Sequence, residues 1–158
     1  MDVEPDPVRP PDADSAPPPG DELVELALAA VELSPEGLEP VKGTVSLVEM
    51  GGGRKLDIVM ARADAVLVQE AIAGDIPPRP RTHDLLLAAV QALSGAVTGV
   101  TLVERRAGGV YVATLLVLRP DGSTAELDAR PSDALNVALR SSGAVLRASP
   151  SLMDVPAN

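Results

Sequence analysis

The hydrophobic core of this chain must be built almost entirely from aliphatic side chains. The 158 residues contain no Phe, no Trp and one Tyr, although 46% of them are hydrophobic. Aromatic side chains bury the most area per residue, so a core without them depends on many smaller contacts among Leu, Val, Ala and Ile. A chain of this length predicts one domain with a closely packed aliphatic core.

Both ends of the chain are expected to lie outside that domain. Residues 1–20 are rich in Pro and Asp and carry almost nothing that could be buried, which predicts a disordered tail. Residues 151–158 are expected to form a flexible C-terminal tail. The folded domain is therefore predicted over residues 21–150.

Turn signals divide this domain into short elements. Gly-rich and Pro-Asp-Gly turns separate alternating, strand-like runs, and three apolar segments with helical spacing end at Gly. The apolar side of the second helix is expected to carry Leu85, Leu86, Ala89, Val90 and Leu93. The predicted strands cover residues 41–49, 55–60, 97–103, 110–118, 124–129 and 144–148, and the predicted helices cover 64–73, 82–94 and 132–141.

The first segment, LVELALAAVEL at residues 23–33, is ambiguous. Its Ala and Leu content favours a helix, whereas its Val residues and partial alternation permit a strand. If it is a strand, the order of elements predicts an α+β fold, with helices packed on one face of a mainly antiparallel sheet.

Two stretches of the chain resemble each other. Residues 59–74 (VMARADAVLVQEAIAG) and 127–143 (LDARPSDALNVALRSSG) both run from a strand through Ala-Arg and an acid-Ala pair into a helix that ends at Gly. Asp64 and Asp133 occupy matching positions. The match indicates a duplicated hairpin-plus-helix unit.

Composition excludes several classes of protein. The absence of Cys excludes disulfides and thiolate metal sites and suits a cytoplasmic location. No apolar run approaches the ~20 residues of a membrane span, so no membrane partner is expected. The net charge of −10 argues against a general duplex-binding surface. After residue 75, however, the chain contains Arg and no Lys. Because Arg can make forked contacts with phosphate, a local phosphate site is compatible with the sequence.

Two polar segments carry the residues that could perform chemistry. The segment PRPRTHDL, residues 78–85, brings His83 and Asp84 to a predicted helix start, and DARPSDAL, residues 128–135, does the same for Asp133. Ordinary capping explains much of this, with Thr82 and Ser132 as N-caps and the acids near the positive helix end. No serine-hydrolase, zincin or P-loop motif is present.

Together these segments resemble the bifunctional nuclease domain family. Its members carry P-R-P-x-T-H-D-L and, about forty residues later, D-x-R-P-S-D-A before an apolar helix, and the resemblance covers roughly residues 23–150. It implies an α+β fold in which residues 23–33 form a strand. It also implies a hydrolase that acts as an RNase and a DNase, so RNA or DNA is the expected substrate.

If the two segments pack together, two functions are open. In the first, the carboxylates of Asp84, Asp128 and Asp133 form a catalytic site with His83, which acts as general acid or base. The carboxylate oxygens hold Mg²⁺ or Mn²⁺, and Arg79, Arg81 and Arg130 bind phosphate. In the second, the same groups form a buried Arg–Asp lock in a noncatalytic binding or regulatory module. Arg130, flanked by two acids, favours the lock.

A homo-oligomer is also expected. The run Val110–Leu118 is apolar on both of its alternating sets of side chains. A sheet with helices on one face leaves its other face or an edge strand to be covered by a second copy.

Overall fold

The computed structural model describes residues 22–37 and 39–153 and confirms an α+β fold, with seven strands and four helices in that part of the chain. The expected N-terminal tail, residues 1–20, lies outside the described residues. The strands are β1 Val24–Leu33, β2 Lys42–Glu49, β3 Lys55–Ala61, β4 Ala96–Arg106, β5 Val110–Leu118, β6 Thr124–Ala129 and β7 Val145–Ala148, and the helices are α1 Arg62–Ala73, α2 Thr82–Ala92, α3 Pro131–Arg140 and α4 Pro150–Met153.

The strands form one mixed sheet in the order β3-β2-β1-β7-β4-β5-β6. Five neighbouring pairs are antiparallel, and β4 and β7 are parallel. The ambiguous segment 23–33 is a strand, as the family resemblance implies. The short strand β7 joins two three-stranded meanders, β1-β2-β3 and β4-β5-β6, because it pairs with β1 on one side and with β4 on the other.

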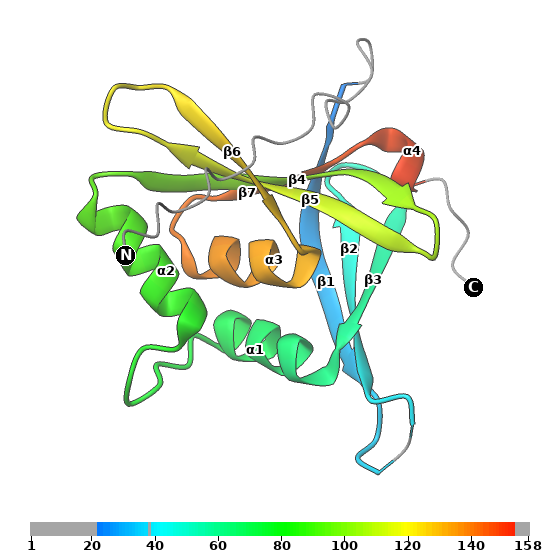
Figure 1. Ribbon diagram of the computed structural model, residues 1–158. Helices are drawn as coiled ribbons and strands as arrows, with labels where there is room; N and C mark the ends of the chain where they lie inside the picture. The colour runs from blue at the N-terminus through cyan, green and yellow to red at the C-terminus, as the bar shows by residue number, and fades with distance from the viewer. Residues whose placement is uncertain (1–21, 38, 154–158) are drawn as a thin grey trace, which may run out of the picture.

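The sheet curls, so that its two halves enclose an angle in which α1 and α3 lie (Figure 1). Helix α1 packs against β1 and β2, whereas α3 packs against β4 and β5 and contacts α1. Helix α2 closes the open side by packing on α3. The two strand-to-helix turns, after β3 and after β6, therefore face each other across the α1–α3 contact.

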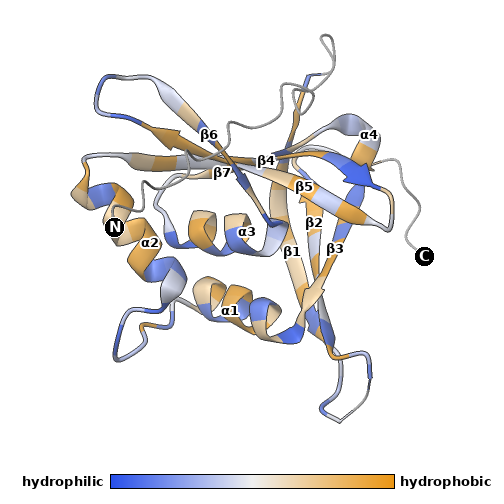
Figure 2. Cartoon of the chain, viewed as in Figure 1, coloured by the Kyte–Doolittle hydropathy of each residue, from blue (hydrophilic) through white to orange (hydrophobic). Residues whose placement is uncertain are grey.

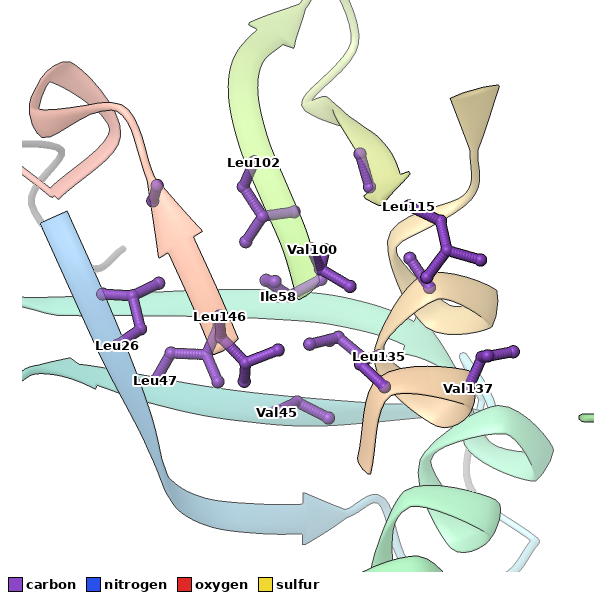
Figure 3. Packing of buried hydrophobic residues seen from close by; sticks show 14 of the residues in the cluster. Leu26, Val45, Leu47, Ile58, Val100, Leu102, Leu115, Leu135, Val137 and Leu146 are labelled. Atoms are coloured by element: carbon purple, nitrogen blue, oxygen red, sulfur yellow. The ribbon is translucent and has the colours of Figure 1, made fainter. Parts of the chain in front are cut away.

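The core that fills this angle is aliphatic, as the composition predicts. Side chains from β2, β3, β4 and α3 meet there (Figure 3). Leu47, Ile58, Val100, Leu102 and Leu135 are each at most 1% exposed. Tyr111, the one aromatic residue, is only partly buried and packs against the edge of this cluster.

The first residues of the expected C-terminal tail are helical and packed on the sheet. Residues 150–153 form α4, and Leu152 and Met153 are both 4% exposed. Helix α4 packs on β3 and β4, away from the other three helices. The prediction of a flexible segment from residue 151 was therefore wrong for residues 151–153, because two apolar side chains anchor them to the core. Residues 154–158 lie outside the described part of the chain.

Helix α2 buries the side opposite to its apolar stripe. Leu85, Leu86 and Leu93 are 64%, 44% and 78% exposed, whereas His83 and Leu87 are buried. Figure 2 shows hydrophobic colour along this helix at the outside of the molecule. The helical spacing was correct, but of the predicted stripe only Val90 packs against the core. The leucines face outward, because polar contacts described below orient the other side of the helix inward.

The two meanders have the same order of elements. Three antiparallel strands lead into α1 in the first, and three lead into α3 in the second. Their turns differ in detail, since Pro131 begins α3 and Arg62 begins α1. A common origin of the two units stays a prediction.

We expect Gly43→Ala to destabilise the fold by about 1–3 kcal/mol through overpacking. A Cβ at Gly43 would lie well inside van der Waals contact of the Ala65 Cβ, and 3.2 Å from Leu33 Cδ2. The substitution would push α1 off β2. Gly53→Ala is the matched control, because nothing lies within 4 Å of the added methyl group. Urea denaturation measures both, and equal stabilities would contradict the close α1–β2 contact.

Candidate active site

The second motif turns from β6 into α3 at Arg130. This residue is extended, with φ −65° and ψ 143°, and Pro131 occupies the first helical position. Proline suits that position because its missing N–H would have no partner there. The helix start therefore lies at Arg130 rather than at Ser132, and no side chain caps it. The turn places the Arg130 and Asp133 side chains next to each other.

Arg130 and Asp133 form a forked ion pair at the surface. Arg130 Nε donates to Asp133 Oδ2 at 2.7 Å, and Nη2 donates to Oδ1 at 3.0 Å. These hydrogen bonds lower the pKa of Asp133, although burial of the carboxylate acts in the opposite direction. The same hydrogen bonds raise the pKa of Arg130. The Arg130 side chain is 67% exposed. An exposed pair of this kind stabilises a fold by only ~0–1 kcal/mol.

His83 reaches Asp133 from α2. Its Nε2 lies 3.0 Å from Asp133 Oδ1, and the residue is 8% exposed. Because the Asp133 carboxylate accepts, Nε2 must carry a proton. Nδ1 is buried and has no hydrogen-bond partner among the described residues. His83 therefore holds Asp133, and Asp133 in turn holds Arg130.

Asp64 joins the cluster from the start of α1. Its Oδ2 lies 3.7 Å from Arg130 Nη1, and its side chain is 19% exposed. Asn136 of α3 fixes this turn by donating to the Asp64 carbonyl at 3.2 Å. Sequence reasoning did not include Asp64 among the site residues, although its match with Asp133 in the repeated segments was the signal that could have found it.

A pocket of about 430 Å³ lies beside these groups. We call it the edge pocket, because it lies between edge strand β3 and the hairpin that joins β4 to β5. Asp64 and Arg130 are its charged lining residues. The edge pocket is lined by Ile58, Val59, Met60, Ala61, Asp64, Gly108, Gly109, Val110, Tyr111, Arg130, Pro131 and Ser132.

Arg140, near the end of α3, forms a second and more buried network. Its side chain is 12% exposed, and its Nε donates to Asp84 Oδ1 at 3.1 Å. Nη1 donates to the carbonyl and to Oδ1 of Asn136, and Nη2 donates to the Leu67 carbonyl at 3.1 Å. One guanidinium thus joins α1, α2 and α3. A partly buried arginine–aspartate pair is present, but Arg140 forms it rather than Arg130.

The predicted site residues are therefore only partly brought together. His83, Asp133 and Arg130 are in direct contact. Asp84 instead binds Arg140 and accepts from the Arg81 N–H at 2.9 Å, which makes Arg81 the N-cap of α2 in place of Thr82.

Of all the predicted site residues, only Arg130 lines the edge pocket. The Arg81 side chain forms an ion pair with Glu70 of α1. Arg79 is exposed in the loop before α2, and Asp128 is exposed on β6 opposite Thr114. None of the ion pairs found among the described residues involves Arg79 or Asp128.

The cluster does not fit the expected Mg²⁺ or Mn²⁺. No group of three His, Asp or Glu side chains within residues 22–37 and 39–153 is arranged to hold a metal ion. Both oxygens of Asp133 accept from Arg130, and Asp64 faces the same guanidinium. A metal ion at these two carboxylates would have to compete with the Arg130 guanidinium, which already lies between them.

Comparison with known proteins places the chain in a family. The sequence pattern described as the bifunctional nuclease domain matches residues 45–154. The chain belongs to the bifunctional nuclease domain family. Two uncharacterised proteins of Mycobacterium tuberculosis, MT1877 of strain CDC 1551 and Rv1829 of strain H37Rv, are each 31% identical to it over 116 residues. The match covers 73% of this chain and 66% of each relative, slightly less than two thirds of their length.

Breaking the Arg140 network should cost far more stability than removing an exposed arginine. We expect Arg140→Met to destabilise the fold by about 3 kcal/mol, because it leaves the partly buried Asp84 carboxylate without its cation. Arg79→Met, at an exposed position, should change the free energy of unfolding by no more than about 0.5 kcal/mol. Urea denaturation of both variants checks this, and similar losses in the two would show that Arg140 does not lock the helices.

Proposed function

We propose that this chain is a nuclease that hydrolyses phosphodiester bonds at the edge pocket. The observation that carries the proposal is the exposed Arg130 guanidinium on the pocket wall. Asp133 fixes it through Nε and Nη2, while Nη1 lies 3.7 Å from Asp64 Oδ2, too far for a hydrogen bond. A pre-oriented arginine with free donors is a good ligand for phosphate. Membership of the bifunctional nuclease domain family supports the same chemistry.

In the proposed reaction, Arg130 neutralises the phosphate and Asp64 acts as general base. Asp64 takes a proton from a water molecule whose oxygen attacks the phosphorus, and the bond from phosphorus to the leaving oxygen breaks. The leaving oxygen takes a proton from solvent, which leaves a phosphomonoester and a hydroxyl group. Preorganised charge and general base catalysis each contribute about 100-fold or more to such reactions. His83 and Asp133 act as positioning residues.

No step of this reaction is assigned to a metal, because the donor set does not fit one. Mg²⁺ is often held by one or two carboxylates together with substrate phosphate. A requirement for Mg²⁺ or Mn²⁺ therefore stays a prediction that the assay below tests. A cytoplasmic location likewise stays a prediction. Within the described residues, none of the helices is both long and apolar enough to cross a bilayer.

A noncatalytic binding or regulatory module is the second candidate. The Arg140 network favours it, because Asp84, a residue of the first motif, serves to hold three helices together. In that case the motifs would mark a structural lock, and Arg130 would bind an anionic ligand without cleaving it.

Cleavage of labelled single-stranded RNA and DNA, with Mg²⁺, with Mn²⁺ or with EDTA, decides between the two. We expect Arg130→Gln and Asp64→Asn each to lower the rate about 100-fold or more, since they remove the phosphate ligand and the base. Melting temperatures should stay close to that of the natural chain because Arg130 is exposed. Arg119→Gln, in the exposed turn after β5, is the matched control.

Equal cleavage by the natural chain and by both site variants would indicate a contaminating nuclease. Absence of cleavage by the natural chain under all three conditions, together with binding of the labelled strands, would favour the binding module.

We also propose that the chain forms a homodimer through the α2 face, defined as Leu85, Leu86, Ala89 and Leu93. These residues are exposed, and the run from Leu85 to Gly95 contains no charged residue. Because the whole chain carries a net charge of −10, two copies repel each other least where they meet through an uncharged surface. Antiparallel pairing of two such helices would place Leu85 of one copy near Leu93 of the other.

Light scattering at micromolar concentration tests the homodimer. We expect a dimer for the natural chain and a monomer for Leu85→Glu combined with Leu93→Glu, because four buried carboxylates would face each other across the twofold axis. Met50→Glu, exposed in the turn between β2 and β3, should remain dimeric. A monomeric natural chain would refute the proposal.

A further inference from the structure

The edge pocket lies where the curled sheet fails to close. On one side is β3, an edge strand of the sheet. On the other side, β6 pairs with β5 only as far as Ala113 and Ala129, so Val110–Val112 have no strand partner there among the described residues. The pocket is therefore a slot between two strand edges, with an apolar wall that includes Ile58 and Met60.

An aromatic ring and a second arginine stand at this slot. Tyr111 lines it, and the Arg105 guanidinium lies 5.5 Å from the centre of the Tyr111 ring. The same guanidinium lies beside Gly109, another lining residue, where Nη2 would be 3.0 Å from an added Cβ. Arg105 is exposed, as is Arg130. The slot thus combines an apolar wall, one aromatic ring and the Arg130 guanidinium, and a second exposed guanidinium, that of Arg105, lies next to two of its lining residues.

Resting on the proposed nuclease function, we infer that the edge pocket receives one unpaired nucleotide of a single-stranded nucleic acid. Its base lies against Tyr111 and the apolar wall, its own phosphate binds Arg130, and a neighbouring phosphate binds Arg105. Aromatic side chains provide the stacking surface for unpaired bases, and arginines follow the backbone of single strands. An apolar wall would have no counterpart in a ligand that consisted of phosphate and sugar alone.

A duplex does not meet these requirements. Its bases are stacked and paired, so placing one in a slot between two strands requires it to be unstacked and flipped out. Continuous duplex binding also needs an extended basic surface, whereas this chain carries a net charge of −10. The few local arginines are enough to hold two phosphates, not a double helix.

Fluorescence anisotropy of three labelled oligonucleotides of equal length separates these ligands. The probes are a single strand, the same strand in a duplex, and an abasic single strand. Measured in the Asp64→Asn variant, which lacks the proposed base, the intact single strand should bind roughly tenfold or more tightly than the other two. Tyr111→Ala in that background should lower its affinity roughly tenfold, and Tyr111→Phe should preserve it.

Arg105→Gln should reduce the slope of log affinity against log salt by about 0.7, the value for one phosphate contact on a single strand. Arg119→Gln should leave this slope unchanged. Equal binding of the intact and abasic strands, a duplex bound as tightly as the single strand, or no binding of the single strand overturns the inference.

The cleavage assay distinguishes failure of this inference from failure of the proposed function. Cleavage of duplex and single strand at equal rates would refute the preference for an unpaired nucleotide and leave the nuclease standing. The expected binding pattern without any cleavage by the natural chain would refute the reaction and leave the ligand class standing.

Discussion

The Arg140 guanidinium holds the three inner helices in one arrangement. It contacts Asp84 on α2, the Leu67 carbonyl on α1 and Asn136 on its own helix. A partly buried charge is tolerated only when its partners are in place, so these contacts restrict how α1, α2 and α3 can pack. Asn136, which is fully buried, extends the same network by donating to the carbonyls of Ser132 and Asp64. The starts of α1 and α3 are thereby fixed relative to each other.

The positions of the charged groups at the edge pocket follow from this network. Asp84 is held by Arg140, and the preceding residue, His83, is therefore directed at the first turn of α3, where it meets Asp133. Asp133 then orients Arg130, whose guanidinium also faces Asp64 across the α1–α3 contact. A series of short contacts thus leads from the partly buried Arg140 to the exposed Arg130. Each member is positioned by the one before it, so the exposed guanidinium has a defined orientation although solvent surrounds most of it.

Sequence reasoning could predict the order of the elements, because turns such as Pro120–Ser123 and the apolar alternation of β5 are local signals. It raised the packing of the two polar motifs only as a condition, and the contact between His83 and Asp133 shows that the condition is met. It could not predict the inward side of α2. As a local sequence signal, the apolar stripe of α2 points more clearly to the core than His83 and Leu87 do. The helix is instead oriented by the partners of His83 and Asp84, which lie 50 and 56 residues away in the sequence. Nor does a strand as short as β7 reveal that it pairs with both β1 and β4.

Burial separates the two functions that the motif residues left open. Arg140 and Arg130 each pair with an aspartate, but the first side chain is 12% exposed and the second is 67% exposed. Removing one partner of a buried pair leaves an uncompensated charge, whereas an exposed pair is screened by water and adds little to stability. The Arg140 pair is therefore constrained by folding. The Arg130 pair adds little to stability, so folding does not require this arginine, and its exposed guanidinium is accessible to a ligand. Because the first network positions the second, a structural lock and a ligand site can occupy neighbouring residues of the same two motifs.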